Sequence, residues 1–335
     1  MNDIDTSPWP RATGTLDLGD LKLRSGGVLR GARIAWRSHG TLNAARDNVV
    51  LYPTSYSAHG ADLEWLIGPH GVLDPTRWFI LIPEMFGNGV SSSPSNTANY
   101  PALVTGWDNV GAQARLLREV WGIERLHAVY GWSMGAQQAY HWAAAFPEAV
   151  ARIIIVCGSA RTAVHNRIFL KSLMAVLEAA PEYDGAGGFS AAPTAALRAF
   201  GRIYAMMAMS QDFYRAGLHG PGPLDDFLRD AWEARYQLRQ AADLLAQLRT
   251  WEAGDIAPGG DLAEALAAIK ARVLLMPGET DLYFRVADNV AEMAHLKAGR
   301  LVPIPSIWGH RAGNPSTNPA DADFIRALVR DFLDH

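Results

Sequence analysis

The sequence predicts an α/β fold: a mostly parallel eight-stranded sheet with helices on both faces and an inserted helical cap. Three observations lead to this prediction. Short apolar runs alternate with helical segments through the first 160 residues, as in repeated strand–helix–strand units. The strand signal then stops between residues 161 and 270 and returns at residue 271. A chain of 335 residues, of which 49% are hydrophobic and 19% charged, is long enough to bury the core of such a fold.

The strands are predicted from short apolar runs bounded by Asn, Pro and Thr. Apolar residues fill nearly all of 77–82 and 151–156, which is typical of strands buried on both faces of a parallel sheet. The first two strands lead into the sheet as an antiparallel pair. The predicted strands are 16–23, 32–38, 48–52, 77–82, 125–130, 151–156, 271–276 and 300–304. Helices are predicted over 136–146, which Pro147 ends, and over 321–333.

The middle of the chain is helical in pattern. Segments 170–179, 195–209 and 224–250 carry apolar residues at three- and four-residue spacing, and Pro- and Gly-containing stretches separate them. A helical block between two strands of one sheet is an insertion into that sheet's domain. We therefore expect a core domain made of residues 1–160 and 271–335, and a helical cap made of residues 161–270.

Composition excludes several classes of protein. Thirty Lys and Arg residues against 34 Asp and Glu give a formal net charge of −4, so no nucleic-acid partner is expected. The single cysteine, Cys157, excludes a disulfide framework and a multi-cysteine metal site. Residues 1–14 lack the apolar segment of a signal peptide, and no run approaches the roughly 20 apolar residues of a membrane span. A cytoplasmic protein that does not bind membranes is expected.

One pentapeptide, Gly131-Trp-Ser-Met-Gly135, carries the chemical signal. It is a G-x-S-x-G sequence placed directly after a predicted strand and directly before a predicted helix. This context indicates a sharp turn that projects the hydroxyl of Ser133 away from the sheet, with glycines where side chains would collide. The pattern predicts Ser133 as a nucleophile.

A serine hydroxyl needs a base and an orienting carboxylate, which are expected after later strands. His310 follows the last predicted strand and is the expected base. Asp281 follows strand 271–276 and is the expected carboxylate, with Glu279 as the alternative. The order Ser, Asp, His along the chain is the one typical of this architecture.

An oxyanion hole needs two backbone N–H donors near the substrate carbonyl. Met134 is expected to supply one, because it follows the nucleophile. Thr54 is expected to supply the other, with Ser55 in reserve, because both follow a strand and Pro53 has no N–H.

Several residues are candidates for a substrate pocket. The aromatic ones can equally be plain core residues, since aromatic side chains fill cores as readily as pockets. The histidines other than His310 lack metal-ligand spacing, so no metal is expected. Acyl transfer by a serine nucleophile needs no bound organic cofactor, so none is expected. The candidate pocket residues are Tyr56, Phe86, Trp132, Tyr204, Trp308 and Arg311.

These residues resemble the homoserine O-acetyltransferase branch of the α/β-hydrolase superfamily, from about Leu16 to the closing helix. The resemblance implies the α/β-hydrolase fold, a serine that accepts an acyl group from acyl-CoA and passes it to an alcohol, and the same roles for Ser133, Asp281 and His310. The matching segments are Leu66-Ile-Gly-Pro with Leu73-Asp74, the Phe86-Gly-Asn-Gly loop with Ser-Ser-Pro94, Gly131-Trp-Ser-Met-Gly-Ala-Gln-Gln138, Gly278-Glu-Thr-Asp281 and Gly309-His310.

The departures from that family favour hydrolysis. Family members that acetylate homoserine have Asp directly after the catalytic histidine, where this chain has Arg311, and an arginine before the elbow where this chain has Trp107. A guanidinium in place of a carboxylate repels the ammonium group of homoserine. Water or another alcohol is therefore expected to accept the acyl group. Of the two activities, ester hydrolysis is favoured over acyl transfer.

Two further expectations concern partners. The substrate is a small ester or an acyl-CoA, and the amphipathic cap helices permit a homodimer through the cap. A non-catalytic ligand-binding protein on the same fold is the alternative of another class, because one fold hosts unrelated functions.

Overall fold

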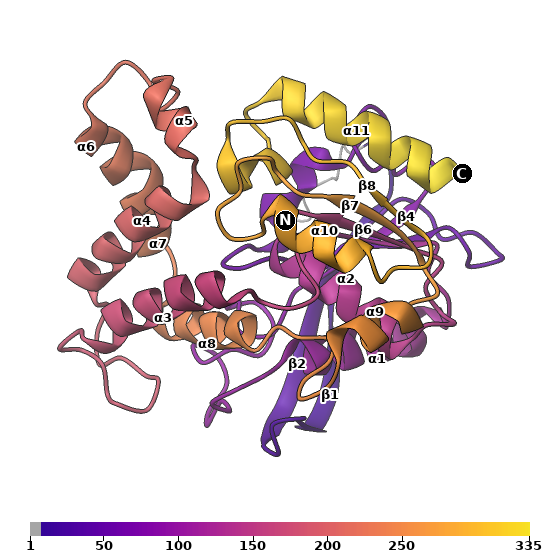
Figure 1. Cartoon of the computed structure of the whole chain (residues 1–335). Coiled ribbons are helices and arrows are strands. Elements are labelled where there is room, and N and C mark those ends of the chain that lie inside the picture. The colour runs from indigo at the N-terminus through magenta and orange to yellow at the C-terminus, as the bar shows by residue number, and fades with distance from the viewer. Residues whose placement is uncertain (1–7) are drawn as a thin grey trace.

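The computed structural model describes residues 8–335 and contains one eight-stranded sheet in the order β1-β2-β4-β3-β5-β6-β7-β8 (Figure 1). Strands β1 and β2 pair antiparallel with each other, β2 pairs antiparallel with β4, and all other pairs are parallel. The predicted fold class is confirmed. The strands are β1 Arg11–Lys22, β2 Val28–His39, β3 Val49–Leu51, β4 Phe79–Pro83, β5 Ala128–Trp132, β6 Arg152–Val156, β7 Arg272–Met276 and β8 Gly299–Leu301.

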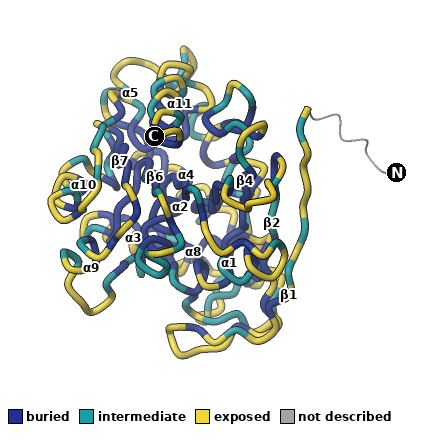
Figure 2. Tube along the Cα trace, turned by 90° about the vertical axis from the view of Figure 1, so that its right-hand side faces the viewer, coloured by how far each residue is buried: buried dark blue, intermediate teal, exposed yellow. Residues whose placement is uncertain are grey.

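Alternation along the buried strands divides the core into two layers. Ile153 and Ile155 of β6 pack in one cluster with α1 (Gly106–Trp121) and α2 (Met134–Ala145). Ile154 and Val156 point to the opposite face and pack with α11 (Pro319–Asp334). Successive side chains of a strand point to opposite faces, so a fully apolar strand such as β6 needs helices on both sides. Dark blue central strands between yellow outer helices show this burial in Figure 2.

Most of the helices between β6 and β7 form a group of their own at one side of the sheet (Figure 1). They share a hydrophobic cluster separate from the two layers of the sheet. The elements are α3 Val164–Glu178, α4 Thr194–Ala208, α5 Gln211–Arg215, α6 Leu224–Phe227, the π-helix Leu228–Glu233, α7 Ala234–Gln237 and α8 Ala241–Glu252.

The segment 224–250, predicted to be helical in pattern, is helical over most of its length but divided into several elements. A π-helical turn interrupts it at Leu228–Glu233, and the helix breaks again before Gln240, whose backbone is extended. At the second break the Arg239 guanidinium donates to the Ser57 carbonyl oxygen at 2.9 Å and to Asp62 at 2.9 Å. Ser57 and Asp62 are distant from Arg239 in the sequence, so the helical periodicity of the segment gives no sign of the break.

The remaining helices pack around the sheet or lie in the loops that follow its strands. Leu266 of α9 (Leu262–Ala268) packs in the same cluster as α1 and α2, although the predicted cap extends to residue 270. Met293 of α10 (Val286–Met293) packs against that cluster too. A 3-10 helix, Gly60–Leu66, follows the loop after β3, and a second, Gly309–Gly313, contains His310.

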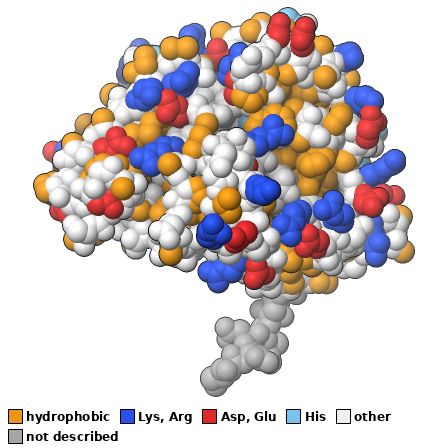
Figure 3. Space-filling view, turned by 90° about the horizontal axis from the view of Figure 1, so that it is seen from below, with side chains coloured by type: hydrophobic (Ala, Val, Ile, Leu, Met, Phe, Trp, Pro, Cys, Tyr) orange, Lys and Arg blue, Asp and Glu red, His pale blue; other side chains and the backbone are white. Residues whose placement is uncertain are grey.

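No helix in residues 8–335 is both long enough and apolar enough to cross a membrane. Basic and acidic side chains are interspersed on the face shown in Figure 3, without a broad field of one sign there. Residues 1–7, which belong to the segment predicted to carry no signal peptide, lie outside the described residues.

Candidate active site

The predicted turn at Ser133 is present between β5 and α2. Ser133 has φ 58° and ψ −127°, a conformation that costs a non-glycine residue about 1–3 kcal/mol. A Cβ atom on Gly131 would lie 2.3 Å from the Gly135 carbonyl oxygen, and one on Gly135 would lie 2.7 Å from the Pro53 carbonyl oxygen. Backbone atoms cannot move away as a side chain can, so glycine is required at both positions.

The structure brings together the three residues predicted from distant parts of the sequence. His310 Nε2 lies 2.9 Å from Ser133 Oγ, and His310 Nδ1 lies 2.7 Å from Asp281 Oδ2. All three are buried, with 2%, 3% and 5% of the surface of Ser133, His310 and Asp281 exposed. The alternative carboxylate, Glu279, is exposed to solvent. These contacts form a continuous hydrogen-bonded path from the hydroxyl through the imidazole to the carboxylate.

Backbone donors fix the orientation of Asp281. Its Oδ1 accepts hydrogen bonds from the amides of Tyr283 at 2.9 Å and Phe284 at 3.1 Å, which leaves Oδ2 for His310. Thr280 Oγ1 donates to the Ser306 carbonyl oxygen at 2.8 Å, so the loop that carries Asp281 is tied to the segment leading to His310. The loop after β7 and the loop after β8 are thereby held in a fixed position relative to each other.

Aromatic rings enclose the imidazole of His310. Trp132 stacks on it with ring centroids 5.1 Å apart, and Tyr283 and Phe284 lie at 4.4 and 5.6 Å. Rings on several sides limit the rotation of the imidazole and exclude water from it. A drier site strengthens each electrostatic contact among these residues.

A cavity of about 320 Å³ opens beside Ser133 and His310. Of the predicted pocket residues, Tyr56, Trp132, Tyr204, Trp308 and Arg311 line it. The cavity also has a wall from the inserted helices that the sequence analysis did not assign, because side chains on the apolar face of an amphipathic helix look like core residues. Besides Tyr204, that wall comprises Ala208, Met209, Phe213, Leu218, Phe227, Ala231, Trp232, Arg235 and Tyr236.

The prediction that Phe86 lines the pocket is wrong. Phe86 is buried in the cluster that contains α1 and α2, and its amide donates to Asn109 Oδ1 at 2.8 Å. The chain turns back after it, where the Gly87 amide donates to the Ser92 carbonyl oxygen at 3.0 Å and Gly87 has φ 84°. This turn and the bond to α1 direct the Phe86 ring into the core.

The prediction for the second oxyanion donor also needs correction. The Thr54 amide donates to the Pro83 carbonyl oxygen at 3.3 Å, and Thr54 contributes nothing to the cavity wall. Ser55, the reserve candidate, does line the cavity, and its hydroxyl donates to the Trp132 carbonyl oxygen at 2.5 Å. Met134 is the first residue of α2, so its amide has no acceptor within the helix.

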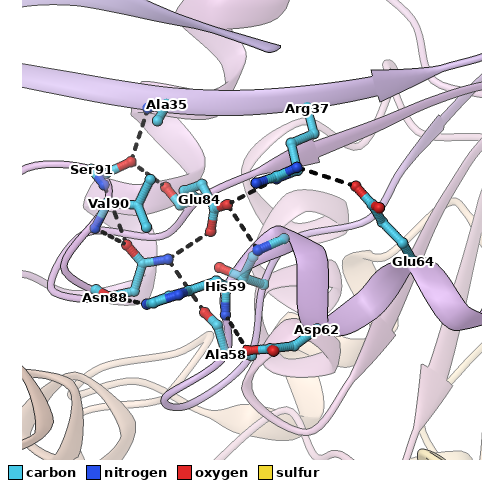
Figure 4. Close-up of polar contacts among 12 residues, drawn as sticks. Ala35, Arg37, Ala58, His59, Asp62, Glu64, Glu84, Asn88, Val90 and Ser91 are labelled. Carbon is cyan, nitrogen blue, oxygen red and sulfur yellow. Dashed lines mark hydrogen bonds and ion pairs between the residues drawn. The ribbon is translucent and has the colours of Figure 1, made fainter. Parts of the chain in front are cut away.

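A buried carboxylate supports the loop that borders the cavity (Figure 4). Glu84 Oε1 accepts from the Gly60 amide at 2.8 Å, and its Oε2 accepts from Asn88 Nδ2 at 2.7 Å. Arg37 Nε lies 3.8 Å away, and His59 Nε2 is 3.0 Å from the Asn88 carbonyl oxygen. Burial raises the pKa of Glu84 to about 7, against the opposing effect of these donors. The sequence analysis did not identify this network, whose members are scattered over three segments.

Cys157 lies directly behind the site. It is fully buried, and its sulfur lies within 4.8 Å of ligand atoms of Asp281 and His310. Burial, reinforced by the charge of Asp281, raises the pKa of the Cys157 thiol. A neutral thiol is a poor metal ligand, and Asp281 and His310 already bind each other, so this group does not fit a metal ion.

Comparison with known proteins identifies the class. Residues 60–310 match the family model of the alpha/beta hydrolase fold, so the chain belongs to the α/β-hydrolase fold family. A protein named probable esterase from Corynebacterium glutamicum is 37% identical over 314 residues, which cover 88% of each chain. Ethyl acetate hydrolase from Pseudomonas veronii is 34% identical over 307 residues, again covering 88% of each chain.

Solved structures agree with this assignment. The crystal structure of an acetylester hydrolase from Corynebacterium glutamicum matches with a TM-score of 0.90 and 33% identity, covering 95% of this chain and 96% of that one. By sequence, homoserine O-acetyltransferase from Leifsonia xyli is 27% identical over 338 residues, covering 88% of this chain and 83% of that one. The resemblance predicted from the motifs is confirmed, and the esterases match at higher identity than this transferase.

Proposed function

We propose that the protein is a serine esterase that hydrolyses small esters through an acyl-enzyme. The observation that carries the proposal is the path Ser133 Oγ–His310 Nε2 and His310 Nδ1–Asp281 Oδ2, with contacts of 2.9 and 2.7 Å, at the wall of a cavity. The named esterases among its relatives support the same activity.

In the first half of the reaction, Ser133 Oγ attacks the ester carbonyl carbon while His310 Nε2 takes the hydroxyl proton. The carbonyl oxygen becomes an oxyanion, which the amides of Met134 and Ser55 stabilise from the start of α2 and the loop after β3. His310 then gives its proton to the leaving alkoxide, so the alcohol departs and an acyl-serine ester remains.

In the second half, His310 takes a proton from water as the water oxygen attacks the acyl carbon. The tetrahedral intermediate collapses, the carboxylic acid leaves, and the proton returns to Ser133 Oγ. Throughout, Asp281 keeps the proton of His310 on Nδ1, so that Nε2 faces the serine. Transfer of the acyl group to an alcohol in place of water, with acyl-CoA as donor, is the second candidate, and the relationship to homoserine O-acetyltransferases favours it.

We propose that residues 162–254 act as the cap over this site. The chain leaves and re-enters the sheet's domain where Arg161 and Asp255 form an isolated antiparallel bridge and an ion pair with Nε–Oδ2 at 2.8 Å. Val164 and Ile168 on α3 are exposed by 75% and 60%, and these apolar side chains support a homodimer through the cap, which the sequence permits. Sedimentation of the protein tests the dimer: a single monomeric species would refute it.

The Ser133→Ala variant tests the esterase. We expect its turnover of p-nitrophenyl acetate to fall by about 10³- to 10⁶-fold, because the nucleophile is gone while the fold remains. Ser172→Ala, on the exposed side of α3, is the matched control and should keep wild-type turnover. A fluorophosphonate probe should label the wild type and not Ser133→Ala. Near-normal turnover by Ser133→Ala, or an unlabelled wild type, would favour the non-catalytic binding protein.

A further inference from the structure

Two arginines from different parts of the chain meet at the cavity. Arg235 lies on α7 and Arg311 lies in the 3-10 helix Gly309–Gly313, directly after His310. Both are half-buried, and both line the cavity that also contains Ser133. Two guanidinium groups on one cavity wall make it strongly cationic.

No carboxylate neutralises this pair. Within residues 8–335, no salt bridge of 4.0 Å or less joins Arg235 or Arg311 to an acid. The neighbouring Glu233, in contrast, binds two other arginines, Arg198 at 2.6 Å and Arg202 at 2.5 Å. Burial, reinforced by the charge of Arg235, lowers the pKa of Arg311 to about 10, which leaves it protonated at neutral pH.

Phenol groups beside these arginines add hydrogen-bond donors. The Tyr283 hydroxyl is buried and has no hydrogen-bond partner within the described chain, and Tyr204 and Tyr236 line the cavity. Burial raises the pKa of all three tyrosines, so they stay protonated. Two guanidinium groups that pair with no carboxylate of the described chain, with phenol hydroxyls beside them, suit a planar anion, and a guanidinium binds a carboxylate with two parallel hydrogen bonds.

We propose that Arg235 and Arg311 select esters that carry a carboxylate, such as half-esters of dicarboxylic acids or acetyl esters of hydroxy acids. This proposal rests on the esterase proposed above and names its substrate class. An unpaired cation in a cavity is costly until an anion neutralises it, so the preference is expected over a neutral ester of the same shape. The same charge on Arg311 is expected to repel an acceptor that carries an ammonium group.

Two pairs of near-isosteric substrates test the preference. Acetoxyacetate and acetoxyacetamide place the charge on the alcohol side of the ester, and monoethyl succinate and ethyl succinamate place it on the acyl side. We expect the carboxylate of at least one pair to exceed its amide in kcat/KM by about 10- to 100-fold, the usual effect of a charge-assisted hydrogen bond. The ratio should fall as NaCl is raised, because salt screens charges that solvent can reach.

Variants assign the preference to the two arginines. In Arg311→Gln and Arg235→Gln the carboxylate-to-amide ratio should fall at least fivefold, and Arg311→Lys should retain part of it. Arg229→Gln is the control: it removes a positive charge from the π-helix next to α7, but Arg229 is exposed and pairs with Asp226 and Asp230. Its ratio should equal that of the wild type. Equal turnover of carboxylate and amide by the wild type would overturn the proposal, as would an unchanged ratio in both glutamine variants.

A binding measurement separates this proposal from the esterase itself. Succinate should raise the melting temperature of the Ser133→Ala protein more than succinamide does, and Arg311→Gln in that background should remove the difference. Absence of a difference in the Ser133→Ala protein would overturn the anion site. Turnover of p-nitrophenyl acetate without any preference for carboxylates would overturn the anion site alone and leave the esterase standing.

Discussion

At the scale of single residues, the geometry of the site depends on which groups donate hydrogen bonds to the carboxylate of Asp281. Asp281 has two oxygens with separate partners: Oδ1 is held by the amides of Tyr283 and Phe284, and Oδ2 faces His310. With Oδ1 held by these amides, only Oδ2 is available to accept a hydrogen bond from His310. It can therefore determine which imidazole nitrogen carries the proton.

Replacement of Asp281 by Asn tests this role. The amide keeps the size of the side chain but can turn its NH₂ toward His310, which favours the wrong tautomer and lowers kcat by about 10⁴-fold. Steady-state kinetics on p-nitrophenyl acetate measure the loss. Glu279→Gln, two residues away and exposed, removes the same charge and should leave kcat within about twofold of the wild type. A larger loss in Glu279→Gln than in Asp281→Asn would transfer the role to Glu279.

The residue scale also shows what the sequence could predict. Ser133, Asp281 and His310 were predictable because each follows a strand, and the ends of parallel strands meet at one edge of a sheet. Thr54 and Phe86 were not predictable in the same way. Position in a loop does not reveal that the Thr54 amide bonds Pro83, nor on which side of the sheet the ring of Phe86 lies.

A glycine at the elbow gives a second prediction at this scale. Gly131→Ala places a Cβ atom 2.3 Å from the backbone of Gly135, so we expect a loss of about 3 kcal/mol in the free energy of unfolding. Gly111→Ala, on the exposed side of α1 with nothing within 4 Å, should instead gain about 0.5–1 kcal/mol. Urea denaturation measures both. A Gly131→Ala protein as stable as the wild type would contradict the steric argument.

At the scale of elements, another buried carboxylate joins helices that are distant in sequence. Glu292 of α10 accepts hydrogen bonds from the hydroxyl of Tyr140 in α2 at 2.8 Å, from Asn289 at 3.0 Å and from the Ala160 amide at 2.7 Å. Burial raises the pKa of Glu292 to about 7. The ties hold the start of the inserted helices against the helix that follows Ser133.

This raised pKa predicts the pH dependence of stability. Between the unfolded pKa near 4.5 and the folded value near 7, the native state binds more protons than the unfolded state, so stability falls as pH rises through this window. The difference amounts to about 3 kcal/mol. Glu292→Gln removes the titration, and its free energy of unfolding should fall less between pH 5 and pH 8 than that of the wild type. Parallel pH profiles of the two proteins would contradict the assignment.

The elements differ in how well their sequences predict them. Buried parallel strands such as β6 were predictable because continuous apolar runs leave few alternatives. Helix α1 was not predicted, although Thr105 and Asp108 at its start form a capping box that a search for such pairs would find. The break before Gln240 has no local signal, because Arg239 makes its bonds with the loop after β3.

At the scale of the whole molecule, the inserted helices that we propose as the cap are tied to the core at the cavity as well as at their base. Arg239 donates to the Ser57 carbonyl oxygen, and Gln247 Oε1 of α8 accepts from the Ser57 amide at 2.8 Å. Ser57 lies at the cavity wall, two residues after the proposed oxyanion donor Ser55. The position of the cap and the position of the oxyanion loop are therefore coupled.

Removal of the contact between Arg239 and Ser57 should make the loop after β3 more mobile without unfolding the protein. In Arg239→Ala we expect faster hydrogen exchange at residues 55–60 and a several-fold rise in KM, because the loop and the cap no longer hold each other. Arg249→Ala is the matched control, since the salt bridge of Arg249 is with Glu178 on α3 and not with the loop after β3. It should change neither measurement. Exchange in the loop that rises equally in both variants would show that general loosening of the cap, and not the contact with Ser57, controls the loop.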